Sequence, residues 1–375
     1  QGVSSAASDV YKRQVLFSFE VKPGMVIAED LYNPAGQLVL PAGFVLDEAT
    51  ISKLEYYTIL EVPVDDSPAS IPMAKPVETA HLDNENYSDR LKNSVEFKQF
   101  RADYEVSISH LANILNEAST TGKPIDTESI YKDAEHLINS SKNTIHIFDF
   151  IHNLRNYDDI IATHCQNVAL ISNILGQWLG VTGDDLKVLT TAGLLHDIGK
   201  LTIPQQILNK PGRLSDEEYA LMRDHVKRGY QLLKEQPIDI RIKEVCLLHH
   251  ERCDGSGYPF HAEASRITPF AKIVAIADVY DAMTARRSYR GALCPFDVIQ
   301  MFDEEGLNKY DPHYIMTFLN RITSSYLHNN VRLNDGREGE IVMINPMCLY
   351  RPMVRVGSEF IDLLKNPNLK IEAIL

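Results

Sequence analysis

Hydrophobic residues recur every three or four positions through most of the region from 148 to 325, which is the spacing of one buried face on each of a series of helices. On one of these predicted helices, His164 falls on the same face as Val168, Ile171 and Leu175. A single histidine on such a face is most often a core residue whose ring nitrogens are hydrogen-bonded. Taken alone, His164 therefore indicates little.

The same arrangement recurs on further helices of this region. One is predicted to begin at the capping box of Ser215 and Glu218, and another at Pro269, a residue favoured in the first turn of a helix. An imidazole or a carboxylate on an apolar face is costly unless it is paired or binds a metal ion, so we do not expect all of them to be buried by chance. The inward polar residues on these helices are His225, His249, His250 and Asp278.

An apolar helix end at Leu194 and Leu195 is followed at once by His196 and Asp197, with Lys200 close behind. An adjacent imidazole and carboxylate can hold two different metal ions, and the carboxylate can bridge them, as the hydrolysis of phosphate esters requires. We expect Asp197 to be this bridge. One ion would then be held by His164, His196, Asp197 and Asp278, and the other by Asp197, His225, His249 and His250. Six-coordinate ions would keep two positions each for hydroxide and for phosphate oxygens.

Residues 15–64 consist of short alternating runs of hydrophobic and polar residues, which predict a small α+β domain. We expect a hairpin whose second arm is 38–40, a short helix capped by Asp47, and a strand from Ile59 to Val64. Residues 1–14 are small and polar, and we expect a disordered tail or a cloning scar there.

Three prolines among small polar residues predict a linker over 65–82. A helical lead-in is expected over 83–147, with one helix through 118 and a second from about Pro124 to Ser140. After the helical region the alternating pattern returns over 326–375 and predicts a small β appendage with strands at about 331–333, 339–344, 353–356 and 371–374. The pattern leaves open whether this appendage packs on the helices, forms a dimer or binds a regulator.

The composition of the 375-residue chain narrows these interpretations. No apolar run reaches the roughly 18 residues that a membrane span requires, so we expect a soluble, cytoplasmic protein without a membrane partner. The five cysteines are scattered and are expected to be reduced and mostly buried. A net charge of −14 disfavours DNA and RNA polymers as partners, although a local basic cluster can still hold a small nucleotide.

The region from about 150 to 325 closely resembles the HD-GYP subgroup of the HD hydrolase superfamily, through four motifs in the same order. They are His196-Asp197-Ile198-Gly199-Lys200, His249-His250-Glu251-Arg252, Asp254-Gly255-Ser256-Gly257-Tyr258-Pro259 and Asp278-Val279-Tyr280-Asp281-Ala282-Met283-Thr284. Characterised members of this bacterial subgroup hydrolyse cyclic di-GMP to the linear dinucleotide or to GMP. The resemblance therefore implies a metal-dependent phosphodiesterase that lowers the level of a signalling molecule.

The resemblance also implies roles for individual residues. The seven inward side chains would be the ligands of two divalent metal ions, with iron or manganese favoured and zinc compatible with the donors. Members with a third metal carry a glutamate where this chain has Ile160, so we predict a two-metal site. Asp197 and Lys200 are the expected catalytic residues, with Lys200 on the substrate phosphate or the leaving oxygen. The expected substrate contacts are Lys200, Gly257, Tyr258, Pro259, Asp281, Arg287 and Arg290.

Several of these residues have alternative interpretations. Arg286, Arg287 and Arg290 also fit a solvated basic turn, and Lys200 fits a lysine that reaches solvent from a helix end. Glu251 and Asp281 are more typical of residues that orient His and Arg side chains. Tyr258 fits either stacking on a base or packing within its loop. His261, His313 and His328 have no supporting spacing and are expected at the surface.

Two stretches depart from the family pattern without removing a metal ligand or a cation. They are Phe260 to Ser265, usually rich in glycine, and Arg287-Ser288-Tyr289-Arg290, usually Arg-Pro-Tyr-Arg. We therefore predict a mainly α protein, with an HD-type helical catalytic bundle over 148–325, flanked by a small α+β N-terminal domain and a small β C-terminal appendage. Its expected activity is hydrolysis of cyclic di-GMP to linear pGpG, GMP or both. The same chemistry on another cyclic dinucleotide, a silent cyclic-dinucleotide sensor, and a homodimer or signalling partner bound through the terminal domains all stay open.

Overall fold

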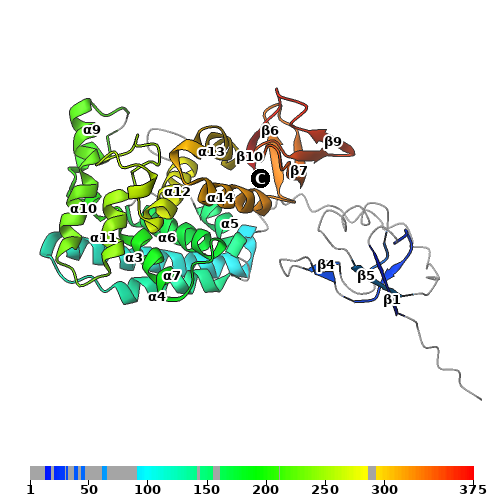
Figure 1. The fold of residues 1–375 in the computed structure, drawn as a ribbon, viewed down its shortest axis with the longest axis horizontal. Coiled ribbons are helices and arrows are strands. Elements are labelled where there is room, and N and C mark those ends of the chain that lie inside the picture. The colour runs from blue at the N-terminus through cyan, green and yellow to red at the C-terminus, as the bar shows by residue number, and fades with distance from the viewer. Residues whose placement is uncertain are drawn as a thin grey trace, which may run out of the picture. The chain divides into compact units, whose positions relative to one another are not determined.

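The structure is a computed structural model of the 375-residue chain. It describes residues 13–17, 21–29, 31–32, 38–40, 44–46, 61–65, 91–141, 144–154, 161–210, 212–285 and 293–375. The chain divides into two compact units, residues 1–83 and residues 84–375 (Figure 1).

The first unit is built from short antiparallel strands. A three-stranded sheet has the order β1-β5-β2, and β3 pairs with β4 in a hairpin. The strands are β1 (Arg13–Phe17), β2 (Val26–Ile27), β3 (Leu31–Tyr32), β4 (Leu38–Leu40) and β5 (Glu61–Asp65). Ile27, Leu46 and Val62 are buried in its core.

The predicted elements of this unit are partly confirmed. The hairpin arm at 38–40 is β4, and the predicted strand from Ile59 to Val64 is β5. Strand β1 begins at Arg13, so the last two residues of the predicted tail belong to the sheet, where Arg13 pairs with Asp65. Residues 1–12 and the helix predicted after Asp47 lie outside the described residues.

The second unit is a helical bundle, which confirms the predicted mainly α fold. Helix α6 lies at its centre, buried along most of its length, and contacts α3, α7 and α12 (Figure 1). Its helices are α3 (Val95–Thr121), α4 (Thr127–Ser140), α5 (Thr144–Leu154), α6 (Ile161–Trp178), α7 (Gly183–Leu195), α8 (Gln205–Leu208), α9 (Asp216–Arg223), α10 (His225–Lys234), α11 (Ile240–Leu248), α12 (Pro269–Thr284), α13 (Pro295–Lys309) and α14 (Pro312–Ser325). Two short 3-10 helices, η1 (Ile198–Thr202) and η2 (Ala264–Arg266), lie between them.

The two helices of the predicted lead-in share one hydrophobic core with the rest of the bundle. Helix α3 begins where the Ser94 side chain accepts a hydrogen bond from the N–H of Phe97 at 3.1 Å. Helix α4 begins at Thr127 rather than near Pro124, because the Asp126 side chain caps it by accepting from the N–H of Ser129.

Two parts of the bundle differ from the prediction. The single helix expected after Ser215 is divided at Asp224 into α9 and α10, although the predicted capping box at its start is present. The region is also not helical throughout, because a loop runs from His249 to Thr268, interrupted by η2. A Cβ atom at Gly257 would lie 2.4 Å from the Cα of Glu251, so only glycine allows this loop to fold back on itself.

The predicted β appendage is confirmed as a five-stranded antiparallel sheet of order β10-β6-β7-β8-β9. Its strands are β6 (Asn330–Leu333), β7 (Glu338–Met343), β8 (Met353–Val356), β9 (Glu359–Asp362) and β10 (Ile371–Ile374), of which β9 was not predicted. Val331, Ile341 and Val354 are fully buried in the same core as the helices. Of the three roles left open by the sequence, packing on the bundle is therefore the one observed (Figure 1).

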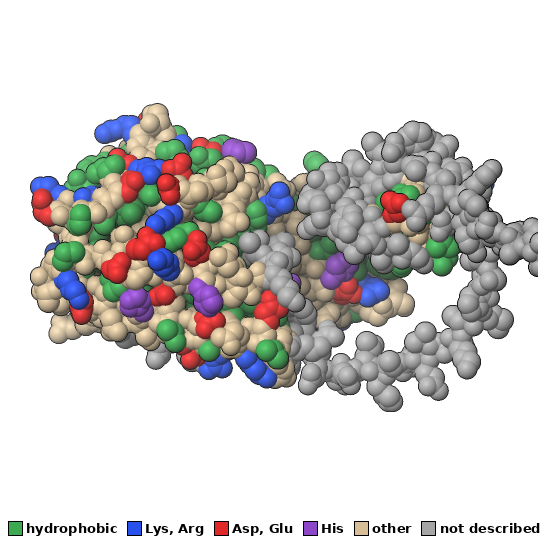
Figure 2. All heavy atoms as spheres, turned by 90° about the horizontal axis from the view of Figure 1, so that it is seen from below, with side chains coloured by type: hydrophobic (Ala, Val, Ile, Leu, Met, Phe, Trp, Pro, Cys, Tyr) green, Lys and Arg blue, Asp and Glu red, His purple; other side chains and the backbone are tan. Residues whose placement is uncertain are grey.

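The charged side chains and the cysteines can be located in the structure. Basic and acidic side chains are interspersed on the face of the molecule drawn in Figure 2. All five cysteines have free thiols, and Cys165, Cys246 and Cys294 are buried, as predicted. None of the helices in the described parts of the chain combines the length and the apolar composition needed to cross a membrane.

Candidate metal centre

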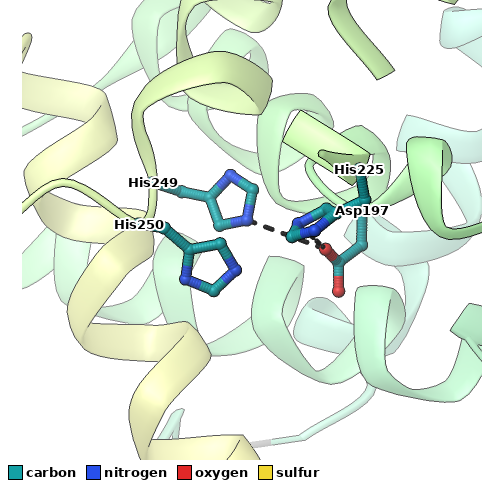
Figure 3. Close-up of side chains that lie close together, drawn as sticks. All are labelled: Asp197, His225, His249 and His250. Carbon is teal, nitrogen blue, oxygen red and sulfur yellow. Dashed lines mark ion pairs between the residues drawn. The ribbon is translucent and has the colours of Figure 1, made fainter. Parts of the chain in front are cut away.

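Five segments of the second unit, distant in sequence, bring all seven predicted ligands to one place. His164 comes from α6, His196 and Asp197 from the junction of α7 and η1, and His225 is the first residue of α10. The other three are His249 and His250 after α11, and Asp278 on α12. Two groups form, each with ligand atoms within 4.8 Å of one another: Asp197, His225, His249 and His250, and His164, His196 and Asp278. Figure 3 shows the first group converging.

Glycines allow these segments to come so close together. A Cβ atom at Gly199 would lie 1.9 Å from the carbonyl oxygen of His225, and one at Gly193 would lie 2.6 Å from the Cα of Ala169. Gly199 therefore allows η1 to lie against α10, and Gly193 allows α7 to lie against α6. These contacts set His196 and Asp197 between the helices that carry the other histidines.

The two carboxylate oxygens of Asp197 face different histidines. Its Oδ1 lies 3.1 Å from Nε2 of His225 and 3.7 Å from Nε2 of His249. Its Oδ2 lies 3.3 Å from Nε2 of His196 and 3.5 Å from Nε2 of His164. This is the geometry that a carboxylate bridging two ions needs.

Asp278 is the second carboxylate of the centre and is likewise shared between the groups. Its Oδ1 lies 3.0 Å from Nε2 of His164 and 3.9 Å from Nε2 of His196. Its Oδ2 lies 3.7 Å from Nδ1 of His250. The division of ligands between two ions deduced from the sequence is thus compatible with these distances, with Asp278 close to both groups.

The hydrogen bonds of three imidazoles leave a nitrogen lone pair directed into the centre. The Nδ1 atoms of His196, His225 and His249 lie 2.7 to 3.1 Å from backbone carbonyl oxygens of the preceding helical turn, so each Nδ1 carries the proton. Their buried Nε2 atoms and Oδ1 of Asp197 have no hydrogen-bond partner among the residues that the structure describes. Each such buried polar atom costs about 1 to 3 kcal/mol if nothing satisfies it.

A metal cation fits this donor set. Nε2 of His225 and Oδ1 of Asp197 are 3.1 Å apart, and with the proton on Nδ1 both present lone pairs to each other. Two facing lone pairs repel unless a cation lies between or beside them. Neutral imidazoles and carboxylates are the donors that iron, manganese and zinc accept.

Two of the histidines are in the neutral state that cation binding needs. Burial lowers the pKa of His249 to about 4 and holds the pKa of His250 well below its usual value, so both rings are neutral. Burial opposes ionisation of Asp197, but Lys200 and His196 hold the pKa of its carboxyl well below the usual range. Burial also opposes charge on His196, yet the adjacent Asp197 carboxylate raises the pKa of that ring well above its usual value. The same negative potential that would keep a proton on His196 would attract a metal ion.

A chain of hydrogen bonds supports His164 from behind. Its Nδ1 lies 2.7 Å from Oδ2 of Asp281, Nδ2 of Asn167 donates to Oδ1 of Asp281 at 3.0 Å, and the Tyr104 hydroxyl donates to Oδ1 of Asn167. All four side chains are buried. The position of Asp281 behind His164 fits the alternative that it orients this ring, and its expected contact with substrate stays a prediction.

Sequence reasoning missed Asn167 and Tyr104. Asn167 follows His164 by three residues on the same helix, so a polar residue on the predicted buried face was a usable signal. Tyr104 lies on α3, outside the motifs, and its aromatic ring fits the core pattern of that helix. No signal in the sequence distinguishes its hydroxyl from that of any other core tyrosine.

Lys200 and Glu251 have well-defined partners. The Lys200 ammonium group contacts Oδ2 of Asp197, and 18% of its side chain is exposed. The buried Glu251 carboxylate accepts from the N–H of Phe260 at 2.7 Å and from the N–H of Ala262 at 2.9 Å. Glu251 therefore holds the loop after Pro259 in place, which corrects the expectation that it orients a His or an Arg.

The loop that follows the double histidine covers one side of the centre. The Tyr258 ring stacks on the ring of His250, with centroids 4.7 Å apart and an interplanar angle of 25°. The Arg223 guanidinium lies 4.5 Å from the Tyr258 ring centroid. The predicted substrate contacts Arg287 and Arg290, together with Arg286 and the position of Ile160, lie outside the described residues. His261, His313 and His328 are exposed, as expected.

Comparison with known proteins finds an HD domain match and similar phosphodiesterases. Residues 150–314 match the model of the HD domain. The chain is 28% identical over 313 residues to cyclic di-GMP phosphodiesterase PA4108 of Pseudomonas aeruginosa, which covers 83% of this chain and 70% of that protein. It is 32% identical over 208 residues to a cyclic di-GMP phosphodiesterase of Thermotoga maritima, which covers 52% of this chain and 56% of that protein.

A third relative is named for a different nucleotide. The chain is 40% identical over 131 residues to 3′3′-cGAMP-specific phosphodiesterase 2 of Vibrio cholerae, which covers 34% of this chain and only 25% of that protein. This chain thus spans less than two thirds of the length of the Thermotoga and Vibrio relatives. Residues 150–314 are thus similar to an HD domain, and the motifs at His196-Asp197 and Gly257-Tyr258-Pro259, which carry the resemblance to the HD-GYP subgroup, lie within this one helical bundle.

Proposed function

We propose that this protein is a metal-dependent phosphodiesterase that hydrolyses cyclic di-GMP to linear pGpG, GMP or both. The single observation that carries the proposal is the position of Asp197, whose two oxygens face two separate groups of imidazole Nε2 atoms. The Pseudomonas and Thermotoga relatives, both named as cyclic di-GMP phosphodiesterases, support the choice of substrate.

Seven side chains would hold two divalent metal ions, with iron or manganese favoured and zinc compatible. His164, His196, Asp197 and Asp278 would hold one ion, and Asp197, His225, His249 and His250 the other. When bound, such a pair supplies the positive charge that activates water and stabilises in-line displacement at phosphorus.

The chain's own residues would act around this pair. Asp197, ionised because of Lys200 and His196, would keep the two ligand groups at a fixed separation. The ammonium group of Lys200, next to Asp197 and partly exposed, would donate hydrogen bonds to a phosphate oxygen or to the departing 3′ oxygen. Asp281 would fix the orientation of His164 by accepting from its Nδ1.

Two other functions remain alternatives. The Vibrio relative named for 3′3′-cGAMP favours the same chemistry on another cyclic dinucleotide. A catalytically silent sensor of cyclic dinucleotides is disfavoured, because a protein that only binds its ligand does not need the complete set of seven donors. A cytoplasmic location, and a homodimer or signalling partner engaged through the terminal regions, stay predictions.

The test is turnover by the metal-loaded protein. The full chain would be purified without oxygen, loaded with iron or manganese, and assayed with cyclic di-GMP and with 3′3′-cGAMP, with the products separated by chromatography. We expect cyclic di-GMP to be converted to pGpG or GMP. A protein that carries two metal ions per chain and leaves cyclic di-GMP intact would contradict the proposal, and cleavage of 3′3′-cGAMP alone would support the first alternative.

A further inference from the structure

A small cavity next to the metal centre carries basic side chains that the proposed catalytic residues do not include. Its volume is about 180 Å³, and its lining comprises Ala220, Arg223, Asp224, Lys227, Tyr258 and Pro259. Tyr258 connects this cavity to the centre, because the same ring stacks on His250, one of the candidate ligands. The cavity and the candidate ligand His250 thus contact the same aromatic ring.

The two cations in this cavity form no ion pair with any residue that the structure describes. Within the described part of the chain, no carboxylate lies within ion-pair distance of Arg223 or Lys227. The acidic residue of the lining, Asp224, accepts from Nε of Arg228 at 2.7 Å and is therefore already paired. A local positive charge next to the centre is notable in a chain of net charge −14.

The Arg223 guanidinium lies close to two aromatic rings. Its guanidinium carbon lies 4.5 Å from the ring centroid of Tyr258 and 5.9 Å from that of Tyr219. An aromatic ring has no acceptor for the N–H groups of a guanidinium in its plane, so these groups stay available for two parallel hydrogen bonds to a phosphate. Lys227, one helical turn further along and exposed, adds a second positive charge at the cavity wall.

We propose that Arg223 and Lys227 form an anion subsite that binds the phosphodiester of the substrate that is not being cleaved. This inference rests on the proposed function, because a cyclic dinucleotide has two phosphodiesters and only one can be attacked at a time. A subsite for the second one would favour substrates with two phosphates over simple phosphodiesters. It would also compensate locally for the repulsion between an acidic protein and a doubly charged nucleotide.

The test compares a substrate with two phosphates and a substrate with one. The metal-loaded full chain would be assayed with cyclic di-GMP and with bis(p-nitrophenyl) phosphate, and cyclic di-GMP would also be tested as an inhibitor of the aryl diester reaction. The variants are Arg223→Gln and Lys227→Gln. The matched control is Lys234→Gln, which removes one positive charge from the end of α10, the helix that carries Lys227. Lys234 lies outside the cavity and 3.8 Å from Glu235.

We expect Arg223→Gln to raise the KM and the inhibition constant of cyclic di-GMP about tenfold, as the loss of one charge-assisted contact would. Lys227→Gln should have a smaller effect of the same kind, since the side chain is exposed. For Arg223→Gln, the fold-change in the constants of cyclic di-GMP should exceed the fold-change for the aryl diester. The amount of metal bound per chain should equal that of the parent protein. The control Lys234→Gln should have the same constants as the parent protein.

Two outcomes would overturn the subsite. One is an Arg223→Gln variant whose constants for cyclic di-GMP equal those of Lys234→Gln. The other is a general defect of Arg223→Gln, seen either as an equal loss of activity on both substrates or as a loss of bound metal. Arg223 would then only support Tyr258 and the centre. A parent protein that is inhibited by cyclic di-GMP without cleaving it would contradict the proposed function, while weaker inhibition of Arg223→Gln would still support the subsite.

Discussion

Nδ1 of His164 lies 2.7 Å from Oδ2 of Asp281, and this contact fixes which nitrogen of His164 faces the metal centre. Because Asp281 accepts at Nδ1, the lone pair of Nε2 is directed at the centre, 3.0 Å from Oδ1 of Asp278. A buried carboxylate behind a candidate ligand also makes the imidazole a stronger donor to a cation. The role of Asp281 can therefore be tested by metal affinity, separately from turnover.

Asp281→Asn should weaken metal binding without unfolding the protein. The amide keeps the size of the carboxylate but loses its charge, and its single oxygen can accept from either His164 or Asn167 but not from both. We expect the affinity for the metal held by His164 to fall between about 10- and 100-fold, as is usual for residues that orient metal ligands. Competition with a chelator, followed by metal analysis, measures this. A variant with unchanged affinity would show that Asp281 does not position His164.

Tyr104→Phe tests how far this support extends into the helix that precedes the family match. The change removes the hydroxyl that donates to Oδ1 of Asn167 and leaves a buried amide oxygen without that donor. We expect a loss of about 1 to 2 kcal/mol in the free energy of unfolding, together with a modest loss of metal affinity. Denaturant unfolding with and without metal separates the two effects.

Tyr131→Phe on the neighbouring helix α4 is the control for this change. Its hydroxyl donates to Glu135 at 2.6 Å near the surface, so the loss should be smaller than for Tyr104→Phe and independent of metal. Equal losses for the two variants, or a metal dependence for Tyr131→Phe, would contradict a specific role for Tyr104.

The periodicity of the sequence indicated the burial of those candidate ligands that lie within regular helices. His164 and Asp278 are fixed by the helical repeat, and both are buried where the pattern indicated. The loop side of the site could not be predicted in the same way. Glu251 turned out to hold the loop through two backbone N–H groups, and backbone contacts leave no pattern in a sequence.

The other differences have equally local causes. The contact between Arg223 and the ring of Tyr258 could not be predicted from the sequence, because Tyr258 is 35 residues away in a loop without periodicity. The segments before and after Asp224 both carry the hydrophobic spacing of a helix. This spacing continues across Asp224, so the sequence does not predict the break there. Strand β9 was missed because its short run is mostly exposed and only Ile361 is buried.

Substitutions at Asp197 and at Lys200 should distinguish a loss of metal binding from a loss of catalysis alone. Asp197→Ala removes the carboxylate shared by the two ligand groups, so we expect both the bound metal and more than about 100-fold of the activity to be lost. Lys200→Ala should keep the metal content, because the lysine is not a ligand, and lose about 100-fold in kcat. Metal analysis and steady-state kinetics on the same preparations measure both quantities. Normal turnover by Asp197→Ala with two metals bound would rule out the mechanism.

The close approach of η1 and α10 gives a prediction about stability. A Cβ atom at Gly199 would lie 1.9 Å from the carbonyl oxygen of His225 and 2.5 Å from the backbone nitrogen of Gly229, so Gly199→Ala must push the two segments apart. We expect a loss of about 1 to 3 kcal/mol in the free energy of unfolding. Because the displaced segments carry His196, Asp197 and His225, metal affinity should fall as well.

Gly306→Ala is the matched control for this substitution. Gly306 lies inside helix α13, where a Cβ atom would meet Phe302 and Ile315 at ordinary distances of 3.5 to 3.6 Å. Alanine loses less backbone entropy on folding than glycine, so this variant should be neutral or more stable by up to about 1 kcal/mol. Thermal or denaturant unfolding of the two variants gives the comparison. A Gly199→Ala variant that is as stable as Gly306→Ala and binds metal normally would contradict this prediction. The ligands would then be positioned by something other than the close packing of η1 on α10.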